Sequence, residues 1–199
     1  FVPQGVGLTG RTLGVIGYGR IGREVVRLLA PWEMDILVAQ RTPVAEDAVR
    51  HVPLTTLLAE SDVVVVACPL TEETRGLLDA SRLALMKPTA FLVNVARGAI
   101  VDQRALVQAL RDERLAGAGV DVVDPEPLPS DDALLELPNV VNIRARVGSP
   151  EAQIATPQRR RAHDAGCCLA PSTRATACAK VDQVSAFLCS CRRPSVVRR

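Results

Sequence analysis

A glycine-rich turn near the start of the chain has the spacing needed to hold the phosphates of a nucleotide. Gly17, Gly19 and Gly22 form a Gly-x-Gly-x-x-Gly pattern between an apolar run from Thr12 and an amphipathic pattern that reaches Leu29. In a strand–turn–helix unit, the first glycine permits the turn, the second lets the backbone approach a pyrophosphate, and the third lets the helix pack on the strand. The helix N-terminus then presents N–H groups and a favourable dipole to the phosphates. The pattern predicts a dinucleotide site, although such spacing also occurs in purely structural turns.

The residues after the second apolar run bear on which dinucleotide would bind. That run, at residues 36–39, lies at the distance expected for a βαβ unit and is followed by Gln40-Arg41-Thr42. An acid is usual at this place, where it binds the ribose 2′-hydroxyl of NAD. Residues 40–42 contain no carboxylate that would repel a 2′-phosphate, and the guanidinium of Arg41 could pair with such a phosphate. We therefore expect NADP(H) to be favoured over NAD(H), unless Arg41 points into solvent and the site is indifferent.

The rest of the body alternates between apolar runs and helical patterns. Strands are predicted at residues 62–67, 90–95, 117–122 and 140–143, and helices around 54–59, near 79–85 and from a cap at Asp102 to about residue 114. About six parallel strands with helices between them make a Rossmann-like, doubly wound α/β sheet. Ligands of such sheets bind outside the carboxyl ends of the strands. Residues 17–22, Cys68, Pro69, Arg97 and Asp121 all fall at those ends.

Charge and cysteine content change near residue 150. Residues 1–156 carry 15 Lys and Arg against 20 Asp and Glu, whereas residues 157–199 carry 9 against 2. Five of the six cysteines also lie beyond the change, in a segment with no sustained helical or strand period. We therefore expect a dinucleotide-binding domain at residues 1–150 and a basic, cysteine- and arginine-rich tail at residues 151–199 that is disordered.

Two functional interpretations of the tail, metal binding and nucleic-acid binding, fit its sequence less well than disorder does. Its cysteine pairs, with His163, lack the two-residue gap of a usual zinc knuckle, so we expect no metal. The arginine clusters at residues 159–161 and 192–199 lack interleaved aromatic residues or a recognisable module, so we expect no specific nucleic acid. The chain also has no apolar run of about 18 residues and no signal-peptide pattern, which favours a cytoplasmic protein without a membrane partner.

Four motifs together resemble the D-isomer-specific 2-hydroxyacid dehydrogenases, over roughly residues 8–141. They are the glycine-rich segment at residues 8–22, Cys68-Pro-Leu-Thr-Glu-Glu-Thr-Arg-Gly-Leu77, Asn94-Val-Ala-Arg-Gly-Ala-Ile-Val-Asp102 and Gly119-Val-Asp-Val-Val-Asp-Pro-Glu-Pro127. The resemblance implies an NAD(P)-dependent oxidoreductase that acts on the CH–OH group of a small D-2-hydroxy acid. It implies hydride transfer to or from the corresponding 2-oxo acid, and dimers built on the dinucleotide domain.

The resemblance also implies roles for individual residues. Arg97 is similar to the family's substrate-binding arginine, whose planar guanidinium pairs with a carboxylate and polarises the neighbouring carbonyl. Glu126 resembles the glutamate that hydrogen-bonds the catalytic histidine. Asp121 is similar to the residue that holds the nicotinamide carboxamide. The full set expected at the cofactor is Gly17, Gly19, Arg20, Ile21, Gly22, Gln40, Arg41, Thr42, Cys68, Pro69, Thr74, Val95, Ala96 and Asp121.

The proton-transferring histidine of the family is not found. After Asn139-Val-Val the family carries a Thr-Pro-His or Thr-Ser-His motif, whereas an ungapped alignment here puts Ala145 at the histidine's place. His51 and His163 are expected to be ordinary solvated histidines. By back-translation, a one-base change of reading frame near residue 142 would restore a histidine motif and explain the changed composition beyond it.

Three interpretations of the whole chain stay open. The family places most of its substrate domain before the dinucleotide domain, and we expect that part to be absent from this sequence. The chain is then a dehydrogenase or a fragment of one that takes a small 2-oxo or 2-hydroxy acid. Alternatively, it is a catalytically inactive protein that binds or senses the nucleotide, or a truncated gene product without a function.

Overall fold

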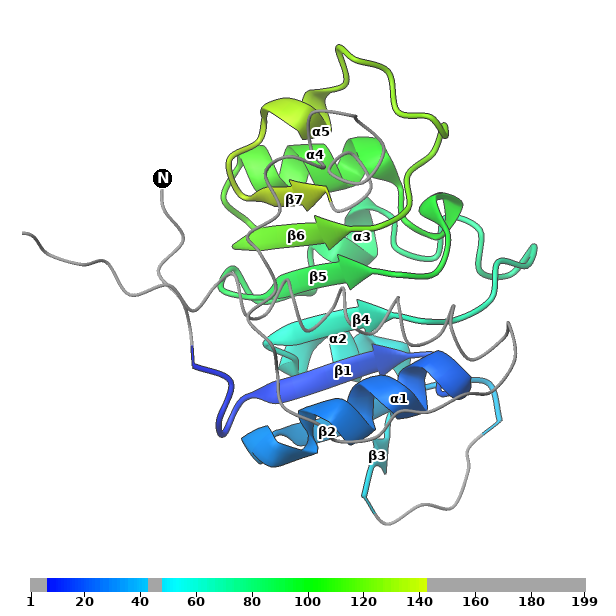
Figure 1. Cartoon of the computed structure of the whole chain (residues 1–199), viewed down its shortest axis with the longest axis vertical. Helices are drawn as coiled ribbons and strands as arrows, with labels where there is room; N and C mark the ends of the chain where they lie inside the picture. The colour runs from blue at the N-terminus through cyan, green and yellow to red at the C-terminus, as the bar shows by residue number, and fades with distance from the viewer. Residues whose placement is uncertain (1–6, 43–47, 143–199) are drawn as a thin grey trace, which may run out of the picture.

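Seven parallel strands form one sheet in the computed structural model, which describes residues 7–42 and 48–142 (Figure 1). The strand order is β3-β2-β1-β4-β5-β6-β7. The strands are β1 (Thr12–Ile16), β2 (Asp35–Ala39), β3 (Arg50–His51), β4 (Val63–Val66), β5 (Phe91–Asn94), β6 (Gly117–Val120) and β7 (Val140–Asn142). The helices are α1 (Arg20–Leu29), α2 (Leu54–Glu60), α3 (Ala80–Leu83), α4 (Gln103–Arg111) and α5 (Ala133–Glu136), with 3₁₀ turns η1 (Ala30–Trp32) and η2 (Gly98–Ile100).

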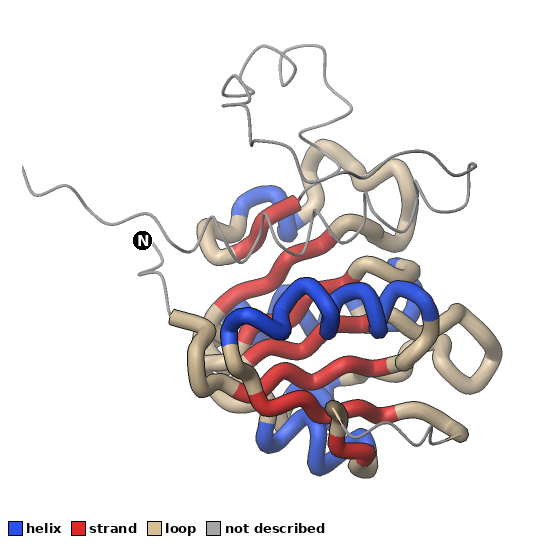
Figure 2. The backbone as a smooth tube through the Cα atoms, turned by 60° about the horizontal axis from the view of Figure 1, so that its bottom comes forward, coloured by secondary structure: helices blue, strands red, loops and turns tan. Residues whose placement is uncertain are grey.

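Helices cover both faces of this sheet (Figures 1 and 2). On one face, α1 packs against alternate residues of β1 and β4, including Val63 and Val65. On the other, α2, α3 and α4 pack over the intervening residues, including Val64 and Val66. Because both faces are buried, β4 is a continuous apolar run rather than an alternating one. The predicted Rossmann-like, doubly wound α/β sheet is confirmed.

Several element boundaries differ from those expected. The short strand β3, with its polar Arg50-His51 sequence, was not predicted, and neither was α5. Helix α4 ends at Arg111 instead of near residue 114, because Glu113 adopts a left-handed φ of 53°. Strand β6 ends at Val120, two residues earlier than expected.

Asp62 fastens the amino edge of the sheet. Its carboxylate accepts a hydrogen bond from the Thr12 N–H at 2.9 Å and pairs with the Lys87 Nζ at 3.0 Å. Burial alone would raise the pKa of Asp62, but the Thr12 N–H and the neighbouring cations outweigh it and hold the pKa below the ordinary value of 3.8. The carboxylate therefore stays charged and joins the first residue of β1 to the start of β4.

Other predictions fall outside the described residues. These are the domain boundary near residue 150, the tail, Ala145 and the reading-frame hypothesis, all of which stay predictions. Within the described residues, no helix is long and apolar enough to cross a membrane.

Candidate functional site

The carboxyl ends of the strands bring the predicted site residues to one edge of the sheet. The chain leaves β1 toward β2 on one side, and returns beyond β1 to β4 on the other. This reversal makes the β1/β4 boundary the point where ligands bind in open parallel sheets. The turns after β1 and β4 meet there, because an ideal Cβ on Gly17 would lie 2.6 Å from the Cα of Cys68.

Two of the three motif glycines are required by close packing. Gly17 has a φ of +91° and abuts the Cys68 backbone, so a side chain there would be both strained and obstructed. A Cβ on Gly22 would collide with the carbonyl oxygen of Gly17 and lie 3.1 Å from Cγ1 of Val15. The helix α1 therefore packs directly on the turn and on β1, as the spacing predicted.

Gly19 differs from the other two, because a Cβ built on it meets no atom of the described residues within 4 Å. It is the N-cap of α1, gives no side-chain hydrogen bond to the helix, and is followed by a first turn without an acid. Its carbonyl oxygen accepts the Arg23 N–H at 3.0 Å. Arg20 is exposed and Ile21 half-buried. The first turn of α1 therefore faces a space that holds no atoms of the described residues near Gly19, and the helix dipole favours an anion there.

The end of β2 is tied to the glycine-rich turn. The Tyr18 N–H donates to Oε1 of Gln40 at 3.2 Å. The Nε2 of Gln40 is buried and has no hydrogen-bond partner among the residues that the structure describes. Arg41 and Thr42 follow and are exposed. The hydrogen bond between Tyr18 and Gln40 therefore fixes the position at which the chain leaves β2, and with it the backbone position of Arg41.

Arg41 does not simply point into solvent. Its Nη1 lies 3.3 Å from Oε2 of Glu73, which comes from the loop after β4. The side chains are 85% and 72% exposed, so this ion pair sits on the outer rim of the carboxyl edge. Glu73 was not among the predicted site residues.

The loop after β4 holds its own shape. The hydroxyl of Thr74 donates to the Pro69 carbonyl oxygen at 2.7 Å and accepts the Thr71 N–H at 2.7 Å. Cys68 is 8% exposed, and burial raises the pKa of its thiol. The thiol therefore stays neutral, which leaves Cys68 in a packing position under Gly17, with exposed Pro69 beyond it.

Asn94 builds the turn that carries Arg97. This residue, 2% exposed at the end of β5, donates from Nδ2 to the Arg97 carbonyl oxygen at 2.9 Å and accepts the Ala96 N–H at 3.1 Å. Val95 and Ala96 have buried side chains, so their backbone is the part that a ligand could reach. The Arg97 side chain is exposed and donates from Nη1 to the Ala96 carbonyl oxygen at 2.8 Å.

The loop after β6 passes directly over this turn. A Cβ on Gly98 would collide with the carbonyl group of Val123, so only glycine allows the two segments to touch. Asp121 is 7% exposed, and its N–H donates to the Asn94 carbonyl oxygen at 3.1 Å. Glu126 is exposed farther along the same loop. The turn with Arg97 and the loop with Asp121 and Glu126 are thus packed together.

Gln103, at the start of α4, holds the far part of that loop. Its Oε1 accepts the Asp124 N–H at 3.3 Å, and its Nε2 donates to Oδ2 of Asp132 at 2.8 Å. The two bonds flank Glu126 in the sequence. Gln103 and Asp102, the predicted cap of α4, therefore set both the helix start and the loop.

Comparison with known proteins decides the family. The family described as D-isomer specific 2-hydroxyacid dehydrogenase, NAD binding domain, matches residues 2–143. The chain belongs to this family.

Similar proteins include glyoxylate reductases. A glyoxylate reductase of Korarchaeum cryptofilum is 48% identical over 141 residues, which are 69% of this chain and 42% of that protein. The chain therefore spans less than half the length of this relative.

Solved structures similar to this chain include a complex with NADPH and a complex with NAD. A D-isomer specific 2-hydroxyacid dehydrogenase from Xanthobacter autotrophicus Py2, in complex with NADPH and MES, has a TM-score of 0.64 and 41% identity, covering 66% of this chain and 56% of its own. An NAD-dependent formate dehydrogenase from Staphylococcus aureus, in complex with NAD, has a TM-score of 0.66 and 36% identity, covering 68% and 42%.

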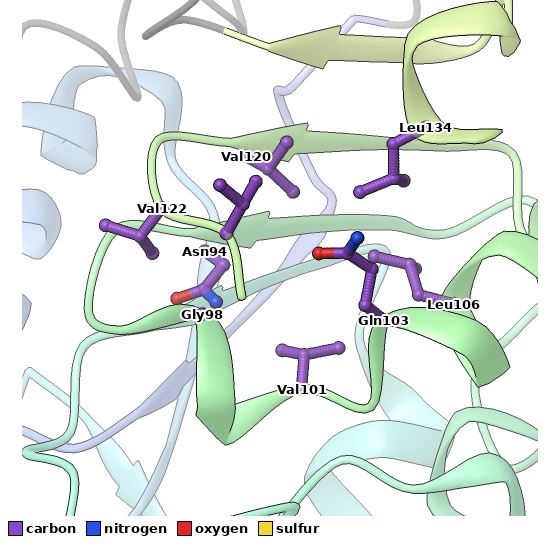
Figure 3. Close-up of a pocket in the computed structure, with 9 residues that line it drawn as sticks. Asn94, Gly98, Val101, Gln103, Leu106, Val120, Val122 and Leu134 are labelled. Carbon is purple, nitrogen blue, oxygen red and sulfur yellow. The ribbon is translucent and has the colours of Figure 1, made fainter. Parts of the chain in front are cut away.

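A small cavity is lined by residues of β5, η2, α4, β6 and α5 and by the loop after β6 (Figure 3). Its volume is about 10 Å³, and valine and leucine side chains form most of its wall. The carboxamides of Asn94 and Gln103 approach it from two sides (Figure 3). Because this space is that of about one water molecule, it belongs to the packing of these elements and holds no cofactor.

His51 is placed differently from the expectation of a solvated side chain. It lies in β3 and is half-buried. Its ring meets the Tyr18 ring edge-on, with the centroids 6.5 Å apart, and Arg23 lies over the same tyrosine at 5.5 Å. The prediction of an ordinary solvated histidine is therefore wrong for His51, which packs beside the glycine-rich turn.

Proposed function

We propose that the carboxyl edge of this sheet binds a nicotinamide dinucleotide, with NADP(H) favoured, and serves oxidation or reduction of a small D-2-hydroxy or 2-oxo acid. The observation that carries the proposal is the meeting of the glycine-rich turn, the uncapped N-terminus of α1 and the loop after β4 at the β1/β4 boundary. This is where a pyrophosphate would be held by backbone N–H groups.

The residues present fit such a cofactor. Among the described residues no atom fills the space over Gly19, and the first turn of α1 itself contains no acidic residue. The Arg97 turn and the buried Asp121 lie at the ends of β5 and β6, farther along the same edge. Gly17, Gly19 and Gly22 would hold the phosphates, and Asp121 the carboxamide of the nicotinamide.

The preference for NADP(H) rests on the end of β2. Gln40 takes the place of the usual acid, and Arg41 follows with an exposed guanidinium that can pair with a 2′-phosphate. Since one relative is complexed with NADPH and another with NAD, family membership alone leaves the choice open. The residues of this chain favour the phosphorylated form.

Arg97 is the proposed substrate-binding residue. When bound, the reduced cofactor supplies a hydride. The Arg97 guanidinium would pair with the carboxylate of a 2-oxo acid and polarise the adjacent carbonyl. Glu126, on the loop after β6, would orient the family's proton-donating histidine, for which this sequence has no matching residue. The glyoxylate reductases among the relatives support a small 2-oxo acid such as glyoxylate as the substrate.

A second candidate is a protein that binds the nucleotide without turnover. The sequence favours it at one place, because Ala145 stands where the family has its proton-transferring histidine. Sequencing the gene around the codon of Asn142 tests the alternative explanation of a changed reading frame. That explanation fails if no one-base shift restores a histidine motif followed by a helical pattern. The homodimer expected from the family also stays a prediction.

Titration of the full chain with NADPH and NADH, followed by nicotinamide fluorescence, tests the proposal. We expect both to bind and NADPH to bind more tightly, with the advantage lost in Arg41→Ala. Arg111→Ala is the matched control, because it removes the same charge from the end of α4. No binding of either nucleotide would refute the site. Oxidation of the bound cofactor after glyoxylate or hydroxypyruvate is added favours the dehydrogenase, and binding without oxidation favours the second candidate.

A further inference from the structure

The ion pair between Arg41 and Glu73 bridges two loops that flank the glycine-rich turn. Arg41 follows β2, and Glu73 lies in the loop after β4. These strands do not touch, since β1 lies between them (Figure 1). The side chains therefore meet across the end of β1, where the turn starts.

We propose that Glu73 is a specificity-determining residue whose carboxylate competes with the cofactor's 2′-phosphate for the guanidinium of Arg41. The inference rests on the proposed nucleotide site. A carboxylate at the end of β2 is the usual device for favouring NAD, and here that position holds Gln40. Glu73 brings the missing negative charge to the same rim from another loop, and so narrows the advantage that Arg41 gives to NADPH.

The loop presents Glu73 from an ordered turn. The backbone N–H of Arg75 donates to the Thr71 carbonyl oxygen at 2.9 Å, and the N–H of Thr74 donates to the same oxygen at 3.2 Å. The Thr74 hydroxyl closes the turn on Pro69. Because Glu73 lies inside this bonded segment, its backbone position is fixed by its neighbours, and only its side chain must move for a phosphate to enter.

The exposure of the pair sets the size of the effect. Both side chains are largely in solvent, at 85% for Arg41 and 72% for Glu73. Opening such a pair reduces affinity by a few-fold at most, and repulsion between the carboxylate and a phosphate adds a similar factor that salt screens. Removing the Glu73 charge is therefore expected to tighten binding of a 2′-phosphorylated ligand about threefold to tenfold at low ionic strength.

Glu73→Gln and Glu72→Gln form a matched pair for the test. Each removes one negative charge from the loop, but only the first removes the partner of Arg41. The probes are NADPH and NADH, and the fragments adenosine 2′,5′-bisphosphate and AMP, which differ only in the 2′-phosphate. In Glu73→Gln we expect tighter binding of NADPH and the bisphosphate, and unchanged binding of NADH and AMP. In Glu72→Gln we expect a smaller change, removed by salt.

Arg41→Ala, alone and combined with Glu73→Gln, completes a double-mutant cycle. In that background Glu73→Gln is expected to lose its specific effect, because the competition has no guanidinium left to act on. Equal effects of the two glutamate variants, or weaker NADPH binding in Glu73→Gln, would overturn the inference. Titration of the wild-type chain distinguishes failure of the proposed nucleotide site from failure of the proposed role of Glu73. If the wild-type chain binds neither nucleotide, both proposals are refuted. If it binds NADPH and NADH, the variants test the role of Glu73 alone.

Discussion

Gly19→Ala should separate nucleotide binding from folding. A Cβ at this position meets no atom within 4 Å in the part of the chain that the structure describes, and the backbone φ of −86° suits any residue. The stability change is therefore that of a poorer N-cap, below about 1 kcal/mol, which shifts the melting temperature by only a few degrees. The methyl group would occupy the space that a phosphate needs. Losing one charge-assisted hydrogen bond of about 1.5–3 kcal/mol weakens binding roughly tenfold to a hundredfold.

Gly22→Ala, the same change three residues later, should lower stability as well as binding. Its methyl group would collide with the Gly17 carbonyl oxygen and crowd Val15, so α1 must move off the turn. Overpacking of this kind costs about 1–3 kcal/mol, and the better helix propensity of alanine returns up to about 1 kcal/mol. We expect a melting temperature several degrees lower, with binding weakened because the helix N-terminus is displaced.

Thermal denaturation by circular dichroism and nicotinamide fluorescence titration measure the two effects on the same preparations. Wild-type affinity in Gly19→Ala would refute the placement of a phosphate over this residue. A wild-type melting temperature in Gly22→Ala would show that the close approach of α1 to the turn does not require glycine. A large loss of stability in Gly19→Ala would contradict the open space around it.

Two further predictions concern the edges of the sheet. Asp62→Asn should destabilise the chain by about 1–2 kcal/mol at neutral pH, since it loses the ion pair with Lys87 but keeps an acceptor. Because the folded pKa of Asp62 lies below 3.8, its stabilisation is complete above that value and lost as the pH falls through the folded pKa, so urea denaturation curves of the two proteins should converge in acid. Gly98→Ala should lower stability by about 1–3 kcal/mol, because its methyl group meets the Val123 carbonyl. Gly19→Ala is its control in thermal denaturation, and equal melting temperatures would contradict the contact.

The sheet could be predicted because its signals are local. Residues 63–66 are four consecutive valines, which only a strand buried on both faces accommodates well. Strand β3 carried no such signal, since it has two polar residues and, among the described strands, pairs with β2 alone. The early end of α4 depends on the left-handed conformation of Glu113, which the sequence does not indicate.

In the candidate site, too, features within one local segment could be predicted and contacts between distant segments could not. The packing of Gly22 followed from spacing, because its contacts with Gly17 and Val15 lie within one strand–turn–helix unit. The turn at Gly17 also followed from spacing, but its contact with Cys68 in the loop after β4 did not. Glu73 and Gln103 were missed, because their partners lie far away in the sequence. Arg41 and Glu73 are 32 residues apart, and Gln103 and Asp132 are 29 apart. Pairs of this kind depend on which strand ends are neighbours, which a single sequence does not specify.

The polar groups at the two edges of this sheet differ in whether they have partners in the described part of the chain. At the amino edge, the charged Asp62 accepts a hydrogen bond from a backbone N–H of β1 and pairs with a lysine, so these groups serve folding. At the carboxyl edge, the first turn of α1 keeps its N–H groups toward open space, and the buried Nε2 of Gln40 finds no partner in the described part of the chain. Such unused donors reduce stability unless a ligand binds them. We therefore expect a bound dinucleotide to raise the melting temperature of the wild type and of Asp62→Asn alike, and to raise that of Gly19→Ala by less at the same nucleotide concentration.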